Sequence, residues 1–505
     1  RPLHGATVPR QVTAVRARSR RGGSWRAADR ADRAPGRPVT PALVSFAMSH
    51  PTPHFDSTAS DPTSLTVAQL AGAYRSGALD PVRVTEAYLS AIGSSPVGTL
   101  AFRVVMEQRA LRQAARAKRQ LEDGIDLGPL HGVPIAIKDL LDTAGEVSAS
   151  ASKVMLDRPA AVEDAPVAAR LDAAGAVFLG RTNMTELAFS GVGLNPHFGT
   201  PPCALDDERV PGGSSSGSGV AVGRHLAAAA VGSDTGGSVR IPAAVNGIVG
   251  LKTTDGRLPT DGAVPLSTTL DTLGPMARDC ADAWALFTAM AALPVSELRP
   301  VDGRLTLLAP TTLLAEDLEE DVRTGFDAAL ATLEKLGHVV EVRPVPLLAE
   351  APALYRRYGS FAGHEAWTLY ETELTERAHE MDPHVTHRMT EYANSPSSNY
   401  IRLHYGMRAL RRRFWAELAG VDAIVAPTIP ILPPRIRDLS DDESYFRANA
   451  SMLRNTAPFN VLGSPAASVP CAVTPGGLSV GLMIVTRPGE DELALRIGLQ
   501  LERGG

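Results

Sequence analysis

Residues 227–252 read AAAAVGSDTGGSVRIPAAVNGIVGLK, and this stretch decides the fold class. It begins with an apolar run at 227–232 and ends with another at 248–251, each of a length that suits a buried strand. Between the two runs lies a turn in which Ser238 follows two glycines. Short buried strands of this kind occur in sheets that helices cover on both faces, so the stretch predicts an α/β core.

Apolar runs and helical patterns alternate on the amino-terminal side of this stretch. Thr66 and Gln69 have the spacing of a capping box, and Asp80 precedes Pro81 at the start of a second expected helix. Further strands are expected at 133–138 and 176–179, and further helices at 106–123, 166–174 and 184–189. Such alternation predicts a largely buried sheet with helices packed against it.

The later half of the chain is more helical but returns to strands near its end. Long charged helices are expected near 316–336, 363–377 and 400–418, inside a helical variable region at about 280–460. Strand-like runs follow at 423–426, 466–470 and 478–485, before a final helix from Glu490. No flexible linker divides the chain, and the late strands can complete the early sheet. We therefore predict a single domain over residues 60–505.

Residues 1–47 have a different composition from the rest of the chain. They contain ten arginines, two acidic residues and no lysine, and the first methionine is Met48. We interpret them as a disordered leader or a non-native extension, although a transit peptide can have the same composition. Without them 40 basic and 53 acidic residues remain, so residues 48–505 have a net charge of −13 while the full chain has −5.

The composition excludes several classes of protein. A net charge of −5 argues against a strongly basic nucleic-acid-binding protein. No run of about 18 or more apolar residues occurs, so no membrane-spanning helix is expected. Cys203, Cys280 and Cys471 are widely spaced and form no C-x-x-C pattern, which predicts neither a disulfide framework nor a zinc site. A reducing, cytoplasmic location fits this cysteine usage best.

The chain uses five lysines and 45 arginines, so each lysine is of interest. Lys138 ends the apolar run GVPIAIK, which starts at Gly132. Arginine does not lose its proton in a protein, whereas burial can lower the pKa of a lysine from about 10.4 toward 7. Lys138 is therefore a candidate general base, even though a lone lysine at a strand end is most often a solvated terminus.

Two segments rich in glycine and serine can supply hydroxyl groups to such a base. PGGSSSGSG begins at Pro211, and GSDTGGSVRIP begins at Gly232. Taken alone, such runs are linkers or anion-binding turns. Residues 217–223 also form a G-x-G-x-x-x-G string, but no predicted strand precedes it, which argues against dinucleotide binding. A serine needs a base to become a nucleophile, and since neither segment contains a histidine, Lys138 is the candidate.

Together these segments resemble the amidase signature family. The motifs that carry the resemblance are GVPIAIKD at 132–139, RVPGGSSSGSG at 209–219 and GSDTGGSVRIPAAVNGIVGLK at 232–252. Similar stretches continue at 265–275 and 456–470. The resemblance implies an α/β fold in which a large mixed β-sheet core is covered on both sides by α-helices. It also implies an amidohydrolase that acts on linear amides and needs no cofactor and no metal.

Matched motif to motif, the resemblance implies a catalytic triad. Lys138 would be the base, Ser214, in a cis peptide, the proton relay, and Ser238 the nucleophile that forms an acyl-enzyme. Ala188 matches a position that contacts substrate in relatives. The oxyanion is expected to bind the backbone N–H groups of four consecutive residues, namely Thr235, Gly236, Gly237 and Ser238.

Other polar residues near these motifs have structural interpretations. Asp234 and Arg240 flank the turn and are expected to pair and fix it. Asp139 follows the lysine, and strand alternation would point it the other way. Ser216 is expected either to add a hydrogen bond near the triad or to face solvent.

The helical region offers three less specific signals. His384 and His387 are the nearest approach to a metal pair, but they do not belong to an H-E-x-x-H motif, so no metal site is predicted. His364 and Glu365 could line a pocket or lie on an exposed helix face, and we expect the exposed face. Arg402 or Arg408 could hold a carboxylated substrate.

Three functions remain open at this point. The first is an amidase that converts a small-molecule amide into a carboxylate and ammonia or an amine, with no nucleic-acid or membrane partner and with a homodimer as one option for its assembly. The second is the A-type subunit of a glutamine-dependent tRNA amidotransferase. Ile241 and Thr253-Thr254 disfavour it, since they replace a glutamine and a Pro-Thr pair of that subunit. The third is a catalytically silent binding protein, which the intact Lys138, Ser214 and Ser238 disfavour.

Overall fold

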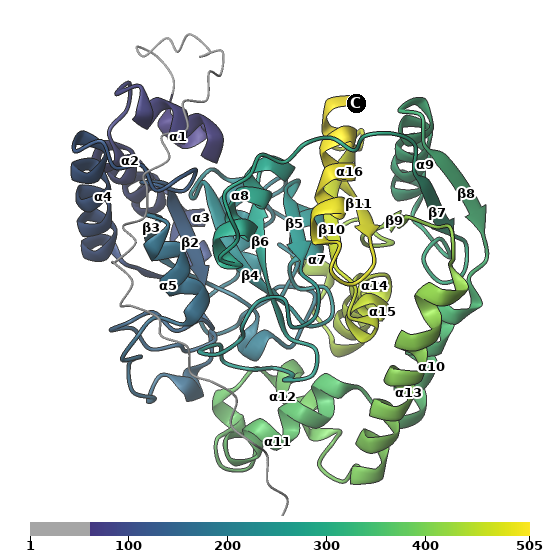
Figure 1. The fold of residues 1–505 in the computed structure, drawn as a ribbon. Helices are drawn as coiled ribbons and strands as arrows, with labels where there is room; N and C mark the ends of the chain where they lie inside the picture. Colours follow the sequence, from purple (N-terminus) through teal and green to yellow (C-terminus); the bar gives the residue numbers. More distant parts are fainter. Residues whose placement is uncertain (1–60, 505) are drawn as a thin grey trace, which may run out of the picture. The chain divides into compact units, whose positions relative to one another are not determined.

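The computed structural model describes residues 61–504, and the leader expected at 1–47 lies outside the described residues. The predicted fold class is confirmed, because the described residues contain one mixed sheet of 11 strands with helices packed around it (Figure 1). The strands are β1 (Phe102–Val105), β2 (Pro134–Lys138), β3 (Val177–Thr182), β4 (Ala229–Asp234), β5 (Val249–Lys252), β6 (Thr272–Ala277), β7 (Thr306–Pro310), β8 (Val339–Arg343), β9 (Ala423–Pro427), β10 (Ala466–Val473) and β11 (Ser479–Val485).

Sixteen α-helices flank this sheet within residues 61–504. They are α1 (Val67–Arg75), α2 (Pro81–Ser94), α3 (Pro96–Ala101), α4 (Glu107–Glu122), α5 (Pro166–Ala173), α6 (Ser216–Gly223), α7 (Arg240–Asn246), α8 (Cys280–Met290), α9 (Glu320–Lys335), α10 (Glu350–Tyr358), α11 (Phe361–Glu376), α12 (Pro383–Thr390), α13 (Ser397–Glu417), α14 (Asp442–Arg454), α15 (Ala457–Leu462) and α16 (Asp491–Gly504).

The strand order brings distant parts of the chain together. Across the sheet it is β1-β3-β2-β4-β6-β5-β10-β11-β9-β7-β8. Strands β3, β2 and β4 run parallel to one another, as do β9, β7 and β8, and antiparallel pairs join the two groups. Because β10 and β11 lie between β5 and β9, the end of the chain completes the sheet that its first half begins.

Capping residues explain where the first helices begin. The Thr66 side chain accepts the Gln69 N–H at 3.2 Å, and the Gln69 side chain accepts the Thr66 N–H at 2.9 Å, so the capping box is confirmed. Asp80 accepts the N–H of Val82 at 2.7 Å, with Pro81 at the first position of α2. A proline fits there because its missing N–H would have no partner inside the helix.

The helix predicted at 184–189 is wrong. Only Glu186–Ala188 forms a short 3-10 turn, and Leu187 and Ala188 have φ angles of 49° and 62°. Positive φ values are incompatible with a right-handed helix, so the apolar pattern of this segment reflects burial and not helical periodicity. The segment is a buried loop beside the serine-rich motif, because the N–H of Thr185 donates to the carbonyl of Ser214 at 3.1 Å.

Strands β1, β6, β7 and β8 are not among those that the sequence predicts. β6 contains Gly274 and Pro275, two residue types that are depleted in strands. It nevertheless pairs with β4 on one side and β5 on the other, where it is fully buried. Tertiary pairing here outweighs local propensity, as it often does in sheets.

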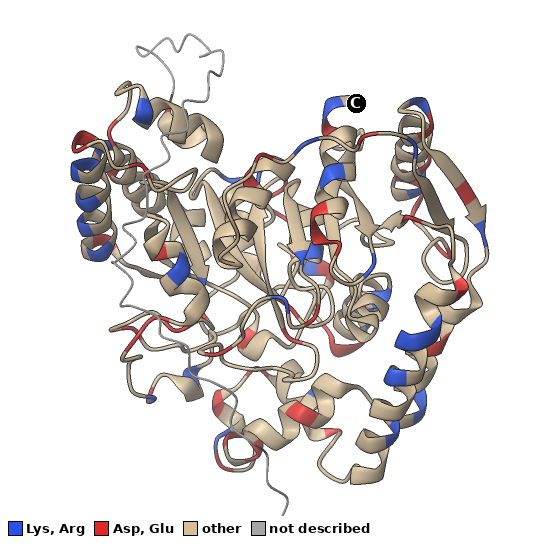
Figure 2. Ribbon diagram, viewed as in Figure 1, with Lys and Arg blue, Asp and Glu red and all other residues tan. Residues whose placement is uncertain are grey.

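Charged side chains lie mostly on the outer helices, and in Figure 2 helices α4 and α13 are banded with blue while most strands are tan. Four basic residues are exceptions, since Lys138, Arg181, Arg240 and Lys252 are fully buried. Each of the four must therefore find its partners inside the protein. No helix within residues 61–504 combines the length and the apolar character needed to cross a membrane.

Candidate active site

Lys138 stands at the end of β2 with three hydroxyl groups around its amine. Nζ lies 2.8 Å from Oγ of Ser214, 2.9 Å from Oγ of Ser215 and 2.8 Å from Oγ of Ser233. Ser233 reaches this place because β2 and β4 are parallel, with Ile137 opposite Val231, so both strands end at the same edge of the sheet. The structure thus places Lys138 beside Ser214 and adds two serines that the sequence did not single out.

Burial has the largest influence on the pKa of Lys138. It lowers the pKa of Lys138 to about 7, while the carboxylates of Asp271 and Asp234 act in the opposite direction. An ammonium ion has three donors, whereas a neutral amine has two donors and a lone pair. Three hydroxyl groups can satisfy either form, because a hydroxyl both donates and accepts. Lys138 can therefore gain or lose a proton without leaving a buried donor unpaired.

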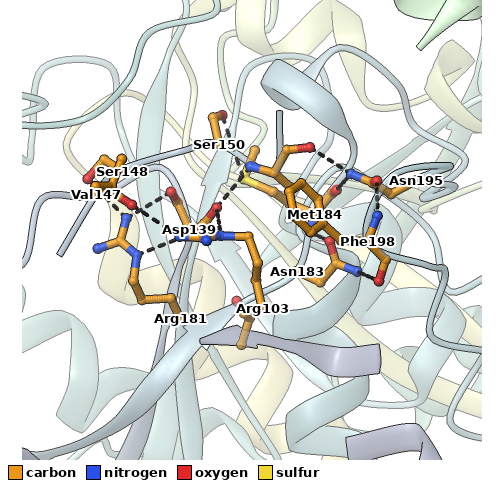
Figure 3. A network of polar contacts seen from close by, with 12 residues as sticks. Arg103, Asp139, Val147, Ser148, Ser150, Arg181, Asn183, Met184, Asn195 and Phe198 are labelled. Carbon is orange, nitrogen blue, oxygen red and sulfur yellow. Dashed lines mark hydrogen bonds and ion pairs between the residues drawn. The ribbon is translucent and has the colours of Figure 1, made fainter. Parts of the chain in front are cut away.

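Asp139 follows Lys138 in sequence but belongs to a separate network, which Figure 3 shows. Its Oδ2 accepts Nε of Arg103 at 2.5 Å, and its Oδ1 accepts Nε of Arg181 at 2.9 Å. The N–H of Ala151 adds a third contact at 2.9 Å. This agrees with the expectation that Asp139 points away from the lysine.

The serine-rich motif places Ser214 between the lysine and the turn that carries Ser238. The peptide bond between Gly213 and Ser214 is cis. The N–H of Ser215 donates to the carbonyl of Ser238 at 3.2 Å, which joins the two motifs. Ser238 is buried, but its hydroxyl forms no hydrogen bond with any residue of 61–504, and none joins it to Ser214 in this structure.

Four consecutive backbone N–H groups in the turn are free. Those of Thr235, Gly236, Gly237 and Ser238 find no acceptor among the described residues. Gly237 has a φ of 142°, and a Cβ built there would lie 2.2 Å from Oγ1 of Thr456, so only glycine fits. The Thr456 hydroxyl also donates to the carbonyl of Gly236 at 2.6 Å, which fixes the direction of the turn. Free, aligned N–H groups are the donors that stabilise an oxyanion.

A buried ion pair between Asp234 and Arg240 fixes the turn. Nη2 of Arg240 lies 2.9 Å from Oδ1 of Asp234, and Nε lies 3.0 Å from Oδ2. Burial alone would favour the neutral acid, but Arg240 and the amide of Asn460 hold the pKa of Asp234 well below its usual range. The expected structural role of this pair agrees with the geometry, since neither charge reaches solvent.

Ala188 lies in the loop that follows β3, and it is buried. Further along the loop, the carbonyl of Gly191 accepts the N–H of Gly213 at 2.8 Å. On its other side, the hydroxyl of Ser190 lies 2.8 Å from the hydroxyl of Tyr445 on α14. The loop is therefore fixed between the cis peptide and the helical region.

Two expectations about polar residues are wrong. Ser216 neither faces solvent nor contacts the triad, because its side chain is buried and its hydroxyl has no partner among the described residues. His364 and Glu365 are also buried and not on an exposed helix face. Glu365 is stabilised there by neighbours that the sequence could not reveal, including the hydroxyl of Tyr400 at 2.7 Å.

The histidines of α12 take part in packing and ion pairs. The ring of His384 stacks on that of Tyr445 with centroids 3.8 Å apart, and its Nε2 lies 3.2 Å from Oδ1 of Asp442. Within residues 61–504 no group of three His, Cys, Asp or Glu side chains is arranged to hold a metal ion. Arg402 and Arg408, the candidates for a substrate carboxylate, are both exposed on α13.

Comparison with known proteins gives a consistent result. Residues 83–495 match the family described as Amidase. The chain belongs to the amidase signature family. One relative, the 2-amino-5-chloromuconic acid deaminase of Comamonas testosteroni, is 36% identical over 405 residues, which cover 78% of this chain and 86% of the relative. Another, the A-type subunit of the glutamyl-tRNA(Gln) amidotransferase of Symbiobacterium thermophilum, is 33% identical over 86% of this chain and 95% of its own length.

Solved structures of the amidase signature family have the same fold. One described as the crystal structure of an amidase superposes with a TM-score of 0.79 at 32% identity, covering 87% of this chain and all of the other. A peptide amidase in complex with the competitive inhibitor chymostatin superposes with a TM-score of 0.73 at 29% identity, covering 87% of this chain and 97% of the other. The named relatives differ in what they act on, so family membership establishes a hydrolase of C–N bonds and leaves the substrate open.

Proposed function

We propose that this amidase hydrolyses the carboxamide of a small molecule to a carboxylate and ammonia or an amine. Ser238 would be the nucleophile, Ser214 the proton relay and Lys138 the base. The observation that carries the proposal is the amine of Lys138, buried in a site where its pKa falls to about 7 and hydrogen-bonded to Ser214. A lysine in that state is close to neutral at physiological pH and can accept a proton.

In the proposed reaction, neutral Lys138 takes the proton of Ser214, and Ser214 takes that of Ser238. The Ser238 oxygen forms a bond to the carbonyl carbon, and the C=O electrons move to oxygen. For this step the Ser238 hydroxyl has to turn toward Ser214, and no hydrogen bond to another described residue holds it back. The proton then returns through Ser214 to the departing nitrogen as the C–N bond breaks. Water hydrolyses the acyl-enzyme by the same path.

The free N–H groups of Gly236, Gly237 and Ser238 would bind the oxyanion, together with that of Thr235. One such donor is typically worth about 2.7–4 kcal/mol in the transition state. The turn suits this role because its direction is fixed before substrate binds, by the Thr456 hydroxyl and by the Asp234–Arg240 pair. Donors that need no reorganisation contribute most to catalysis.

An apolar cavity supports the proposal that the substrate has an acyl group of modest size. It has a volume of about 240 Å³ and lies between α10, α14 and α15, with Ala351, Tyr355 and Val461 among its lining residues. Leu453 lines it as well, and a Cβ on Gly236 would lie 3.3 Å from the Leu453 side chain. Leu453 is thus the residue that separates the cavity from the turn, and burial of an apolar acyl chain in the cavity would strengthen binding.

An arginine near the loop that follows β3 supports the proposal that the substrates include amides that also carry a carboxylate. Arg388 on α12 lies over the ring of Phe189, 4.0 Å from its centroid, and donates to the Phe189 carbonyl. No carboxylate among the described residues forms an ion pair with it. A half-buried guanidinium without an acid partner is a ready site for an anionic group. This makes Arg388 a better candidate for such contact than Arg402 or Arg408.

The second candidate function is a glutamine-dependent amidotransferase subunit. Several relatives bear that name, and glutamine is an amide with a carboxylate. Ile241 and Thr253-Thr254 still differ from the pattern of that subunit. Glutaminase activity that appears only with a co-purifying partner would favour this function over the first.

The test is ammonia release from a panel of aliphatic, aromatic, carboxylated and amino-acid amides. Wild type is compared with Ser238→Ala and Arg388→Gln, and labelling of Ser238 by an alkyl fluorophosphonate is followed by mass spectrometry. We expect turnover and labelling in wild type and neither in Ser238→Ala. Equal turnover by wild type and Ser238→Ala would refute the mechanism. If Arg388→Gln loses turnover only of carboxylated amides, Arg388 is the residue that binds the substrate carboxylate.

A further inference from the structure

Asp271 lies beside the turn that carries Ser238, although the sequence does not single it out. β4 and β6 are antiparallel, and their last paired residues are Asp234 and Thr272. The next residues outward, Thr235 and Asp271, therefore face each other across the end of the pair. The hydroxyl of Thr235 donates to Oδ1 of Asp271 at 2.5 Å.

The second carboxylate oxygen of Asp271 is also occupied. Its Oδ2 accepts the N–H of Leu266 at 2.9 Å and that of Ser267 at 3.0 Å. The Asp271 N–H in turn donates to the carbonyl of Ser267 at 2.8 Å. One side chain therefore connects the loop 265–271 to the first residue of the oxyanion turn.

Helix α11 holds the same loop from its other side. Oε2 of Glu365 accepts the N–H of Thr269 at 3.1 Å and the hydroxyl of Thr268 at 3.2 Å. The hydroxyl of Tyr370 donates to the carbonyl of Pro265. The loop is thus tied to the helical region at its start and in its middle, and Asp271 at its end contacts Thr235.

We propose that Asp271 is a positioning residue of the active site. It holds Thr235, and with it the N–H groups of the oxyanion turn, and its negative charge stabilises the protonated form of Lys138 that arises during the reaction. This inference rests on the proposed function, since it assigns a role to Asp271 only if Lys138 and Ser238 carry out catalysis.

Few charges act on Lys138 from the elements packed against it. Asp139 is paired with two arginines, and Asp234 is paired with Arg240. Asp271 has no ion-pair partner within residues 61–504, and its charge acts on the lysine from the end of β6. Glu365 lies beyond Asp271 and disfavours its ionisation.

These neighbours predict the sign of a pH effect. Burial raises the pKa of Asp271 to about 6, so it is mostly ionised at the pH at which Lys138 becomes neutral. Removing a nearby negative charge destabilises an ammonium ion, so Asp271→Asn should lower the pKa of Lys138 further. Thr235→Val keeps the Asp271 carboxylate but removes a hydrogen bond that lowers its pKa, so it should lower the pKa of Lys138 by less than Asp271→Asn does.

The test measures the rate at which diisopropyl fluorophosphate inactivates the full chain, as a function of pH. We compare wild type, Asp271→Asn, Thr235→Val, the double variant and Thr235→Ser, with thermal unfolding recorded for each. We expect each of the first two changes to slow inactivation at least about tenfold, since both displace oxyanion donors. The double variant should be little slower than the slower single one. Thr235→Ser should react within about threefold of wild type, because it keeps the hydroxyl.

The pH midpoint separates positioning from a structural role. It should move to lower pH in Asp271→Asn and move by less in Thr235→Val. Asp271→Glu keeps the charge but displaces the oxygens, so it should react slowly with an unshifted midpoint, and it replaces Asp271→Asn if that variant does not fold. If the Asp271 variant that folds has the inactivation rate and the pH midpoint of wild type, this inference is overturned and the proposed function is not. A wild-type protein that is not modified at Ser238 would overturn the proposed function and this inference with it.

Discussion

Lys138 and Lys252 occupy corresponding places in the sheet but have different neighbours. Each is the last residue of its strand, β2 or β5, and each is fully buried. Burial lowers the pKa of Lys138 to about 7 and that of Lys252 to about 8. Three hydroxyl groups surround the amine of Lys138, whereas that of Lys252 donates to the carbonyls of Thr253 at 2.9 Å and Ser464 at 3.0 Å.

A lowered pKa therefore does not by itself make a lysine a base. A carbonyl only accepts hydrogen bonds, so the partners of Lys252 have no proton to give. A hydroxyl can donate its proton, so the partners of Lys138 can. The chemistry of each site is thus decided by the group that the amine contacts, a hydroxyl at Lys138 and a carbonyl at Lys252. Substitution of Lys138 should affect turnover, and substitution of Lys252 should affect stability.

The largest expected effect is on turnover in Lys138→Ala. Loss of the base should lower kcat/KM at least about 10³-fold while the protein stays folded. Lys138→Arg should be equally inactive, because a guanidinium does not become neutral. Ammonia release measures the loss, and circular dichroism checks the fold. An active Lys138→Arg variant would show that deprotonation of this side chain is not required.

Lys252→Met should affect stability more than turnover. Removing the amine leaves two buried carbonyls without donors, which we expect to cost about 2–4 kcal/mol in the free energy of unfolding. Urea denaturation measures this cost, and kcat/KM of the folded fraction should stay within about tenfold of wild type. A loss of turnover as large as that of Lys138→Ala, without a loss of stability, would contradict the comparison.

The pH dependence of turnover should follow Lys138. The reaction needs the neutral amine, whose fraction rises about tenfold per pH unit below the pKa of about 7. We therefore expect kcat/KM to rise about 50-fold between pH 5 and 7 and to level off above pH 8 at about 100-fold the value at pH 5. Lys252→Met should have the same profile, because Lys252 contacts no reacting group. A shifted pH profile in Lys252→Met would show that Lys252, and not Lys138 alone, sets the pH dependence of turnover.

The same pKa has a consequence for stability. The folded-state pKa of Lys138 is lower than the unfolded value of about 10.4, so the unfolded chain binds the extra proton between pH 7 and 10. Stability conferred by neutral Lys138 should therefore increase as pH rises through this window. Urea denaturation of wild type and Lys138→Met at several pH values tests the sign. A constant difference between the two would contradict it.

The smallest expected effect is that of Ser216→Ala. The hydroxyl of Ser216 is buried and without a partner in the described residues, so its removal should be neutral or stabilising by up to about 1 kcal/mol. Ser215→Ala is the matched control one residue earlier, and it should reduce turnover because its hydroxyl contacts Lys138. Thermal unfolding and kcat/KM separate the two. A marked loss of turnover in Ser216→Ala would place that hydroxyl in the reaction.

Local signals predict a large part of the fold. The capping residues at Thr66 and Asp80 define helix starts because their contacts lie within three residues. Strands β2 and β4 follow from their apolar runs alone. The loop at 184–189 resembles a helix in sequence because burial from all sides and helical periodicity leave similar apolar patterns. β6 escapes prediction because its glycine and proline are tolerated only through pairing on both edges.

By itself the sequence determined the α/β class, the family resemblance and the three residues proposed for the triad, since each belongs to a contiguous motif of distinctive residue types. Only the tertiary structure decided that Ser233 contacts Lys138 and that Asp271 contacts Thr235. Those contacts arise from the register of β2 with β4 and of β4 with β6. A strand pairing joins residues that are far apart in the chain, and no local pattern specifies which residues will face each other.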